Sequence, residues 1–197
     1  MRGGRGLASG PGACGAADLA PAREGPDGPV RAKERAEHEQ GPWVLSMSLS
    51  EVLAKTYVDA VKYAATHTLD PHSRAGAAIV TAEGKCIVMT HNKLARGVTN
   101  ESWRWNRPQR YLYVEMAPRA AIYEAVRRGE KLDGSWIVTT VFPAADDARA
   151  IIETGFRGLA SPAPDLTDTS ESEYLVSAQR MLFEAAIKVE YLSLAAQ

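Results

Sequence analysis

Two short apolar segments, residues 76–81 and 85–90, flank the turn sequence Ala82-Glu83-Gly84. Short apolar segments around a glycine-containing turn predict a β-hairpin. After the hairpin, helical and β-branched segments alternate to the end of the chain, which predicts strands in one sheet with helices packed on it. This pattern limits the chain to an α/β fold, with a mixed five-stranded sheet and helices on both faces.

The spacing of apolar residues places the other elements. Ser48 and Glu51 form a capping-box pattern at the start of the first helix. Residues 93–110 are polar, contain Trp103, Trp105 and several arginines, and are predicted to be a long loop. The remaining elements share either helical or strand periodicity: helices over 50–66, 117–129, 143–154 and 172–186, and strands over 135–141, 157–160 and 188–192.

The first 46 residues differ in composition from the rest. They are rich in Gly, Ala, Pro and Arg, and Trp43 is their single aromatic residue. Such a segment buries too little apolar surface to offset the entropy of ordering. We predict a disordered tail over 1–46, or an over-extended start, because Met47 lies just before the first patterned segment. The folded domain is predicted to span 47–197.

Charge and cysteine content limit the partners. A net charge of −1 gives no general attraction to nucleic acid, and no apolar run is long enough for a spanning helix. Cys14 and Cys86 cannot build a disulfide framework. We therefore expect a cytoplasmic protein without a membrane partner or a strong nucleic-acid signal. Cys86 is expected to be a buried, inert strand residue.

Five stretches carry a resemblance to a known family through their order and spacing. These stretches are Ser73–Val80, His91–Val98, Arg107–Glu115, Ala148–Ile152 and Val189–Leu192. Over about residues 50–192 the chain resembles the cytidine/deoxycytidylate deaminase superfamily, and most closely its deoxycytidylate branch. The resemblance implies a three-layer α-β-α fold and a tendency to form oligomers.

Deaminases of this superfamily carry the zinc motif H-x-E followed by P-C-x-x-C. In this chain, Met116 stands where the motif has His, Pro118 replaces Glu, and Ala144 and Asp147 replace the two Cys. A thioether is a poor zinc donor, alanine has no donor atom, and proline has no proton to transfer. We therefore predict no zinc, no other cofactor and no deamination of cytosine nucleotides.

Two groups of residues remain as candidates. If the chain is active, Asp147 and Glu115 are the acid–base candidates, although Asp147 also suits a first helical turn. The resemblance implies that Asn92 contacts a sugar hydroxyl, and a local turn is the alternative. The proposed ligand-binding residues are Asn92, Arg96, Arg107, Arg110 and Tyr113. The guanidinium groups of the arginines can each donate two hydrogen bonds to a phosphate. The alternative is that these arginines belong to a solvated loop.

Three functions fit these residues. The first is a pseudoenzyme that binds a nucleotide-like ligand, or that assembles with copies of itself or with a homologue. The second is an enzyme with metal-free acid–base chemistry on a nucleotide or a heterocyclic metabolite. The third is a purely structural interaction protein. We place the non-catalytic binder first, because the chain loses the motif residues but keeps Asn92 and the arginine-rich loop.

Overall fold

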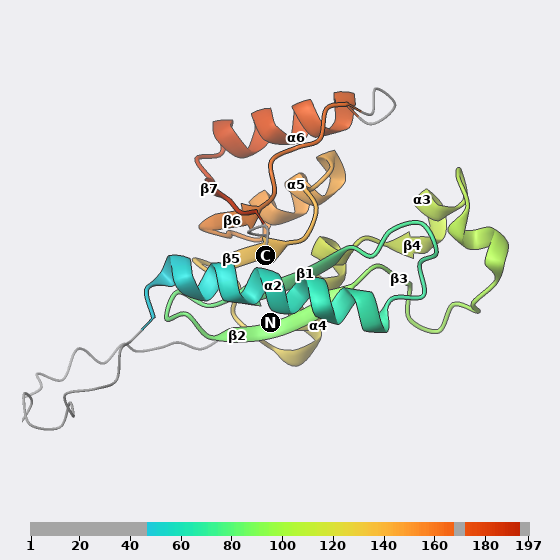
Figure 1. The fold of residues 1–197 in the computed structure, drawn as a ribbon, viewed down its shortest axis with the longest axis horizontal. Helices are drawn as coiled ribbons and strands as arrows, with labels where there is room; N and C mark the ends of the chain where they lie inside the picture. The colour runs from blue at the N-terminus through green and yellow to red at the C-terminus, as the bar shows by residue number, and fades with distance from the viewer. Residues whose placement is uncertain (1–46, 168–171, 194–197) are drawn as a thin grey trace, which may run out of the picture. The chain divides into compact units, whose positions relative to one another are not determined.

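The computed structural model describes residues 47–167 and 172–193 (Figure 1). The predicted tail, residues 1–46, lies outside the described residues. The elements in chain order are α2 (Leu49–His67), β1 (Gly76–Val80), β2 (Cys86–His91), β3 (Lys93–Leu94), η1 (Ser102–Trp105), α3 (Arg110–Tyr113), β4 (Val114–Glu115), α4 (Ala117–Arg128), β5 (Trp136–Thr139), α5 (Ala145–Glu153), β6 (Gly158–Ser161), α6 (Ser172–Glu184) and β7 (Lys188–Tyr191).

Five of the strands form one mixed sheet in the order β2-β1-β5-β6-β7. The hairpin strand β1 pairs antiparallel with both β2 and β5, whereas β5–β6 and β6–β7 are parallel. Each parallel connection runs through a helix, α5 or α6, as parallel pairing requires. The predicted mixed five-stranded α/β fold is confirmed.

Helices cover both faces of this sheet (Figure 1). Alternate residues of a strand point to opposite faces, and β1 divides its side chains in this way. Ala77 and Ile79 belong to the core shared with α4, α5 and α6. Ala78 and Val80 belong to the core shared with α2. The expected three layers are therefore present, with the longest helix alone on one face.

Local sequence sets the helix ends. Ser48 and Glu51 form the predicted capping box at the start of α2. Helix α4 begins after the N-cap Met116 with Pro118 in its first turn, and it ends at Gly129, whose φ of 74° favours glycine. Helix α5 begins after the N-cap Ala144. No described helix is long and apolar enough to cross a membrane.

Two expectations need correction. The segment 93–110 is not one continuous loop: Lys93–Leu94 pairs antiparallel with Val114–Glu115, and η1 lies between these strands. Strands of two residues leave no periodicity to detect. Cys86 is exposed, not buried. It is the first residue of the edge strand β2 and lies beside a register irregularity.

Candidate functional site

The first turns of α4 and α5 carry a cluster of charged side chains centred on Arg119. Its Nε and Nη2 each lie 3.0 Å from Oε1 of Glu115. Its Nη1 lies 3.4 Å from Oδ2 of Asp146, and its Nε lies 3.6 Å from Oδ1 of Asp147. The guanidinium group of Arg119, on α4, therefore joins one carboxylate of β4 to two carboxylates of α5. We call Arg119, Glu115, Asp146 and Asp147 the arginine cluster.

Asp147 is the buried member of this cluster, with 4% of its surface exposed. Its Oδ1 has no hydrogen-bond partner, and 3.6 Å to Arg119 is an ion-pair distance too long for a hydrogen bond. Burial raises the pKa of Asp147 to about 6, against the opposing effects of Arg119 and a hydrogen bond to the Ala144 backbone. Burial also opposes the charge of Arg119, but the cluster's carboxylates, Asp147 first, raise its pKa overall. The cluster thus holds a fixed positive charge beside a carboxyl group that titrates near neutrality.

A second, buried network connects α2, β2 and α4. Asn92 is 1% exposed, and its Nδ2 donates to Oδ2 of Asp70 at 3.0 Å. Its Oδ1 accepts the main-chain N–H of Ala117 at 2.9 Å, one of the donors left open at the start of α4. Arg110 Nη2 donates to the same Asp70 oxygen at 3.1 Å and lies 3.9 Å from Sδ of Met116. Asp70, Asn92 and Arg110 therefore fix the entry to α4.

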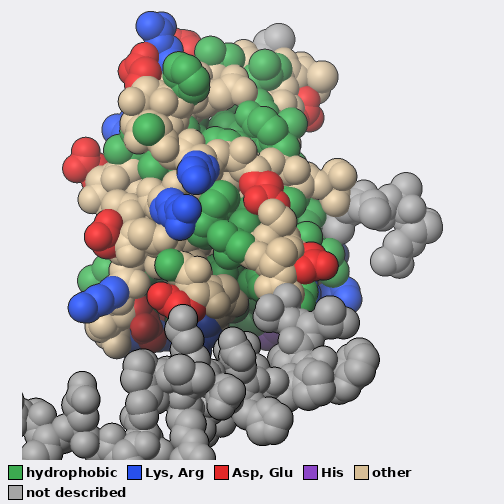
Figure 2. All heavy atoms as spheres, turned by 90° about the vertical axis from the view of Figure 1, so that its left-hand side faces the viewer, with side chains coloured by type: hydrophobic (Ala, Val, Ile, Leu, Met, Phe, Trp, Pro, Cys, Tyr) green, Lys and Arg blue, Asp and Glu red, His purple; other side chains and the backbone are tan. Residues whose placement is uncertain are grey.

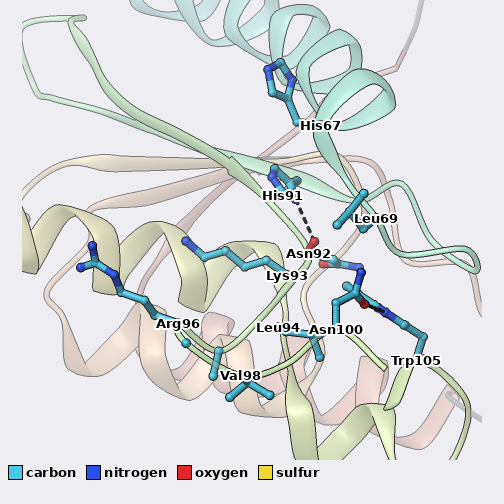
Figure 3. A pocket seen from close by; sticks show the side chains of 12 residues that line it. His67, Leu69, His91, Asn92, Lys93, Leu94, Arg96, Val98, Asn100 and Trp105 are labelled. Carbon is cyan, nitrogen blue, oxygen red and sulfur yellow. Dashed lines mark hydrogen bonds between the residues drawn. The ribbon is translucent and has the colours of Figure 1, made fainter. Parts of the chain in front are cut away.

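A pocket of about 270 Å³ lies beside this network, between the end of α2, β2 and the segment 93–105 (Figure 3). His67 and His91 lie at one side of it, Trp105 and Asn100 at another, and the side chains of Lys93 and Arg96 extend along its outer edge. None of its twelve lining residues carries a carboxylate. At the opposite end of the domain, by contrast, basic and acidic side chains are mixed around an apolar patch (Figure 2).

The two pocket histidines have defined hydrogen positions. Nδ1 of His91 lies 2.8 Å from the carbonyl of Asn92, and Nδ1 of His67 lies 2.9 Å from the carbonyl of Tyr63. A carbonyl oxygen only accepts, so Nδ1 carries the hydrogen in each ring. The rings stack with centroids 6.4 Å apart. In this tautomer, Nε2 of each neutral ring is an acceptor.

Solved structures with a similar fold include deaminases. Two structures of dCMP deaminase from cyanophage S-TIM5 match, the apo form with a TM-score of 0.55 at 18% identity and the complex with dCMP and dUMP with 0.58 at 16%. The matches cover 71% and 75% of this chain and 97% and 100% of the phage chains. This chain has the deaminase fold. The deaminase/reductase from Thermotoga maritima also matches, with a TM-score of 0.51 and 19% identity, over 71% of this chain and 36% of that one. No protein-family model and no curated protein sequence matches.

The four residues that the sequence resemblance aligns with the zinc motif lie at the starts of α4 and α5. Met116 and Ala144 are the N-cap residues, and Pro118 and Asp147 are buried in the first turns. Among the described residues, no group of three or more His, Cys, Asp or Glu side chains is placed to hold a metal ion. Of the motif positions, only Asp147 offers a carboxylate, and that carboxylate faces Arg119.

The predicted ligand-binding residues fall into four places. Asn92 and Arg96 line the pocket, whereas Arg110 is turned inward to Asp70. Arg107 lies over the ring of Tyr111, with 5.7 Å from guanidinium carbon to ring centroid. Tyr113 contacts Trp103 edge to face, and Arg104 lies 4.9 Å from its ring centroid. The five residues therefore do not meet in one site.

The sequence analysis missed two residues of these networks. Asp70 directly precedes Pro71, a position that marks the end of a helix and does not indicate a buried carboxylate. Arg119 was not singled out, although its spacing of four from Glu115 favours an ion pair. Its contacts with Asp146 and Asp147 depend on the packing of α4 against α5, which no local pattern reveals.

Proposed function

We propose that this deaminase-fold chain holds no catalytic zinc and acts as a non-catalytic binder of a nucleotide-like anion. The proposal rests on the arginine cluster. A zinc ion at the starts of α4 and α5 would lie beside the guanidinium of Arg119, which repels a cation, and the carboxylates there, Glu115, Asp146 and Asp147, already pair with that guanidinium. Met116 Sδ already faces Arg110, and Ala144 has no donor atom. The residues present do not fit the metal.

The pocket supports the second part of the proposal. Lys93 and Arg96 supply positive charge, and no lining carboxylate opposes an anion. Its volume of about 270 Å³ is just below the ~300 Å³ at which small-molecule sites begin. Trp105, Leu94 and Val98 give it an apolar wall. A phosphate with its sugar or base matches this combination.

Thermal stability in the presence of nucleotides and nucleosides tests this function. A ligand at 100 times its Kd adds about 2.7 kcal/mol to the free energy of unfolding. We expect stabilisation by nucleoside monophosphates, weaker effects of the matching nucleosides, and recovery of the ligand unchanged, with or without added zinc. Stabilisation that requires zinc, or conversion of a cytosine nucleotide to its uracil form, would overturn the proposal. No change in thermal stability with any of these nucleotides or nucleosides would instead favour a purely structural interaction protein.

One observation favours a second function, metal-free acid–base catalysis. Asp147 is buried, its Oδ1 lacks a hydrogen-bond partner, and its pKa is raised to about 6, where a carboxyl group both accepts and releases protons at neutral pH. Glu115 lies on the other side of the same guanidinium. Under this alternative a ligand from the panel is consumed, and Asp147→Asn abolishes its turnover while leaving its binding intact.

A further inference from the structure

The strand β7 forms one edge of the five-stranded sheet in the described part of the chain. Lys188 and Leu192 direct their main-chain N–H groups to β6, donating to Arg157 at 3.2 Å and to Ser161 at 2.8 Å. In a strand the hydrogen-bonding direction alternates, so Val189 and Tyr191 direct their N–H and C=O groups away from the sheet. Such a row of open groups is a template for another strand.

The two sheet edges differ in regularity. The pairing of β2 is interrupted by a register irregularity between Ile79 and Val80. The pairing of β7 with β6 is regular over all four residue pairs, and the strand contains no proline. Irregular pairing twists a strand and hinders the pairing of a sheet edge with a strand from another chain. Strand β7 is therefore the edge better suited to such pairing.

The charges of β7 select one way for the strand to pair with a second copy of itself. In an antiparallel pair of two β7 strands, the outward groups of the two copies face each other when the pair is symmetric about one residue. Three residues of Lys188–Tyr191 then pair in each copy only when Val189 or Glu190 is at the centre. With Glu190 at the centre, the Glu190 side chains of the two copies lie opposite each other. Centring on Val189 places each Lys188 opposite the other copy's Glu190, and opposite charges across a strand pair stabilise it.

Helix α6 adds apolar surface beside the same edge. Gln179 donates to the hydroxyl of Tyr191 at 3.2 Å, which places this face of the helix next to β7. Val176 and Phe183 lie three residues before and four after Gln179, on the same helix face. Phe183 is 82% exposed, and Val176 and Tyr191 are also exposed. Two copies joined along β7 would bring these side chains toward each other.

We propose that two copies of this chain associate through antiparallel pairing of β7 centred on Val189, to give one continuous ten-stranded sheet. Lys188 and Glu190 form two symmetric ion pairs on the α2 face. Val176, Phe183 and Tyr191 cover the other face. The association is independent of the ligand proposed for the pocket, which lies by β2 at the far edge of the sheet.

Charge reversal tests the pairing without changing the main-chain hydrogen bonds of β7, although Glu190→Lys also removes the hydrogen bond that Ser50 Oγ donates to Glu190 Oε2 at 3.3 Å. Sedimentation equilibrium of the full chain is expected to give twice the mass of one chain. Lys188→Glu and Glu190→Lys are each expected to give single chains, because both place like charges in opposition, and the double variant is expected to restore the dimer. Lys131→Glu, a change of the same charge on an exposed loop, should leave the dimer intact. A single-chain mass for the unaltered protein, or dimers in both single variants, would overturn the proposal.

A disulfide tests the register. Directly opposed residues that exchange hydrogen bonds have Cα atoms about 5.5 Å apart, within the range a disulfide spans. In a chain with Cys14 and Cys86 replaced by serine, Val189→Cys is expected to form a covalent dimer under mild oxidation, and Lys188→Cys much less. Equal cross-linking at both positions would overturn the proposed register. The thermal stability of the Lys188→Glu variant is also measured with nucleotides. Stabilisation of this single-chain variant by a nucleotide shows that the ligand site does not depend on the dimer, so the two proposals can fail separately.

Discussion

The guanidinium Nε of Arg119 lies 3.6 Å from Oδ1 of Asp147, a buried carboxylate oxygen without a hydrogen-bond partner. The two residues lie in the first turns of separate helices, α4 and α5, where the sequence resemblance places the zinc motif. An arginine therefore supplies a permanent cation at this point of the fold. The buried carboxylate depends on that cation, because ionising it alone in the protein interior is costly.

The titration of Asp147 predicts a specific pH dependence of stability. Raising its pKa from the usual 3.8 to about 6 corresponds to about 3 kcal/mol. Between these values the folded state binds more protons than the unfolded state, so stability contributed by this group falls as the pH rises from about 4 to about 6. Asp147→Asn removes this dependence. In urea unfolding, the variant and the unaltered protein should agree near pH 4, and the variant should be more stable by up to about 3 kcal/mol at pH 8. A constant difference at all pH values would contradict this account of Asp147.

Removing Arg119 should leave the buried carboxylate uncompensated. We expect Arg119→Met to lower the free energy of unfolding by about 3 kcal/mol at pH 7.5, and by less near pH 4, where Asp147 is protonated. The double variant Arg119→Met/Asp147→Leu should recover most of the loss, since an apolar pair can replace an ion pair of similar volume. Additive losses in this double-mutant cycle would show that the two side chains are not coupled.

The amide of Asn92 should matter for stability as well as for any ligand. Asn92→Ala leaves the Ala117 N–H without its acceptor and removes one donor from Asp70, so we expect a loss of about 3 kcal/mol in urea unfolding. The exposed Asn106 is a matched control, and Asn106→Ala should cost about 0.5 kcal/mol or less. Unchanged stability of Asn92→Ala with loss of nucleotide binding would instead assign Asn92 to the ligand.

The charges at the pocket edge should set the affinity for anions. Lys93→Glu and Arg96→Glu are each expected to weaken binding of a nucleoside monophosphate about tenfold, or ~1.4 kcal/mol, in low salt. Lys131→Glu should change it little. Isothermal titration calorimetry measures these affinities. Equal affinities for all three variants would exclude this pocket as the anion site.

The fold could be predicted from the sequence because its signals are local. The capping box at Ser48, the glycine turn of the hairpin and the β-branched strand around Val138 each act within a few residues. The candidate site could be located in part, through the starts of α4 and α5. The side-chain contacts of the site could not be predicted. Arg110 is turned toward Asp70, forty residues away in sequence, and Arg119 contacts Asp147 on α5. Such contacts follow from how helices pack, and neither spacing nor composition encodes them.

Metal content measured together with activity tests the central claim most directly. The chain is produced with zinc in the medium, the metal per chain is measured by inductively coupled plasma mass spectrometry, and the same sample is incubated with deoxycytidylate. If the arginine cluster occupies the place of the metal site, we expect far less than one zinc per chain and no formation of deoxyuridylate. About one tightly bound zinc per chain, together with conversion of deoxycytidylate to deoxyuridylate, would contradict it.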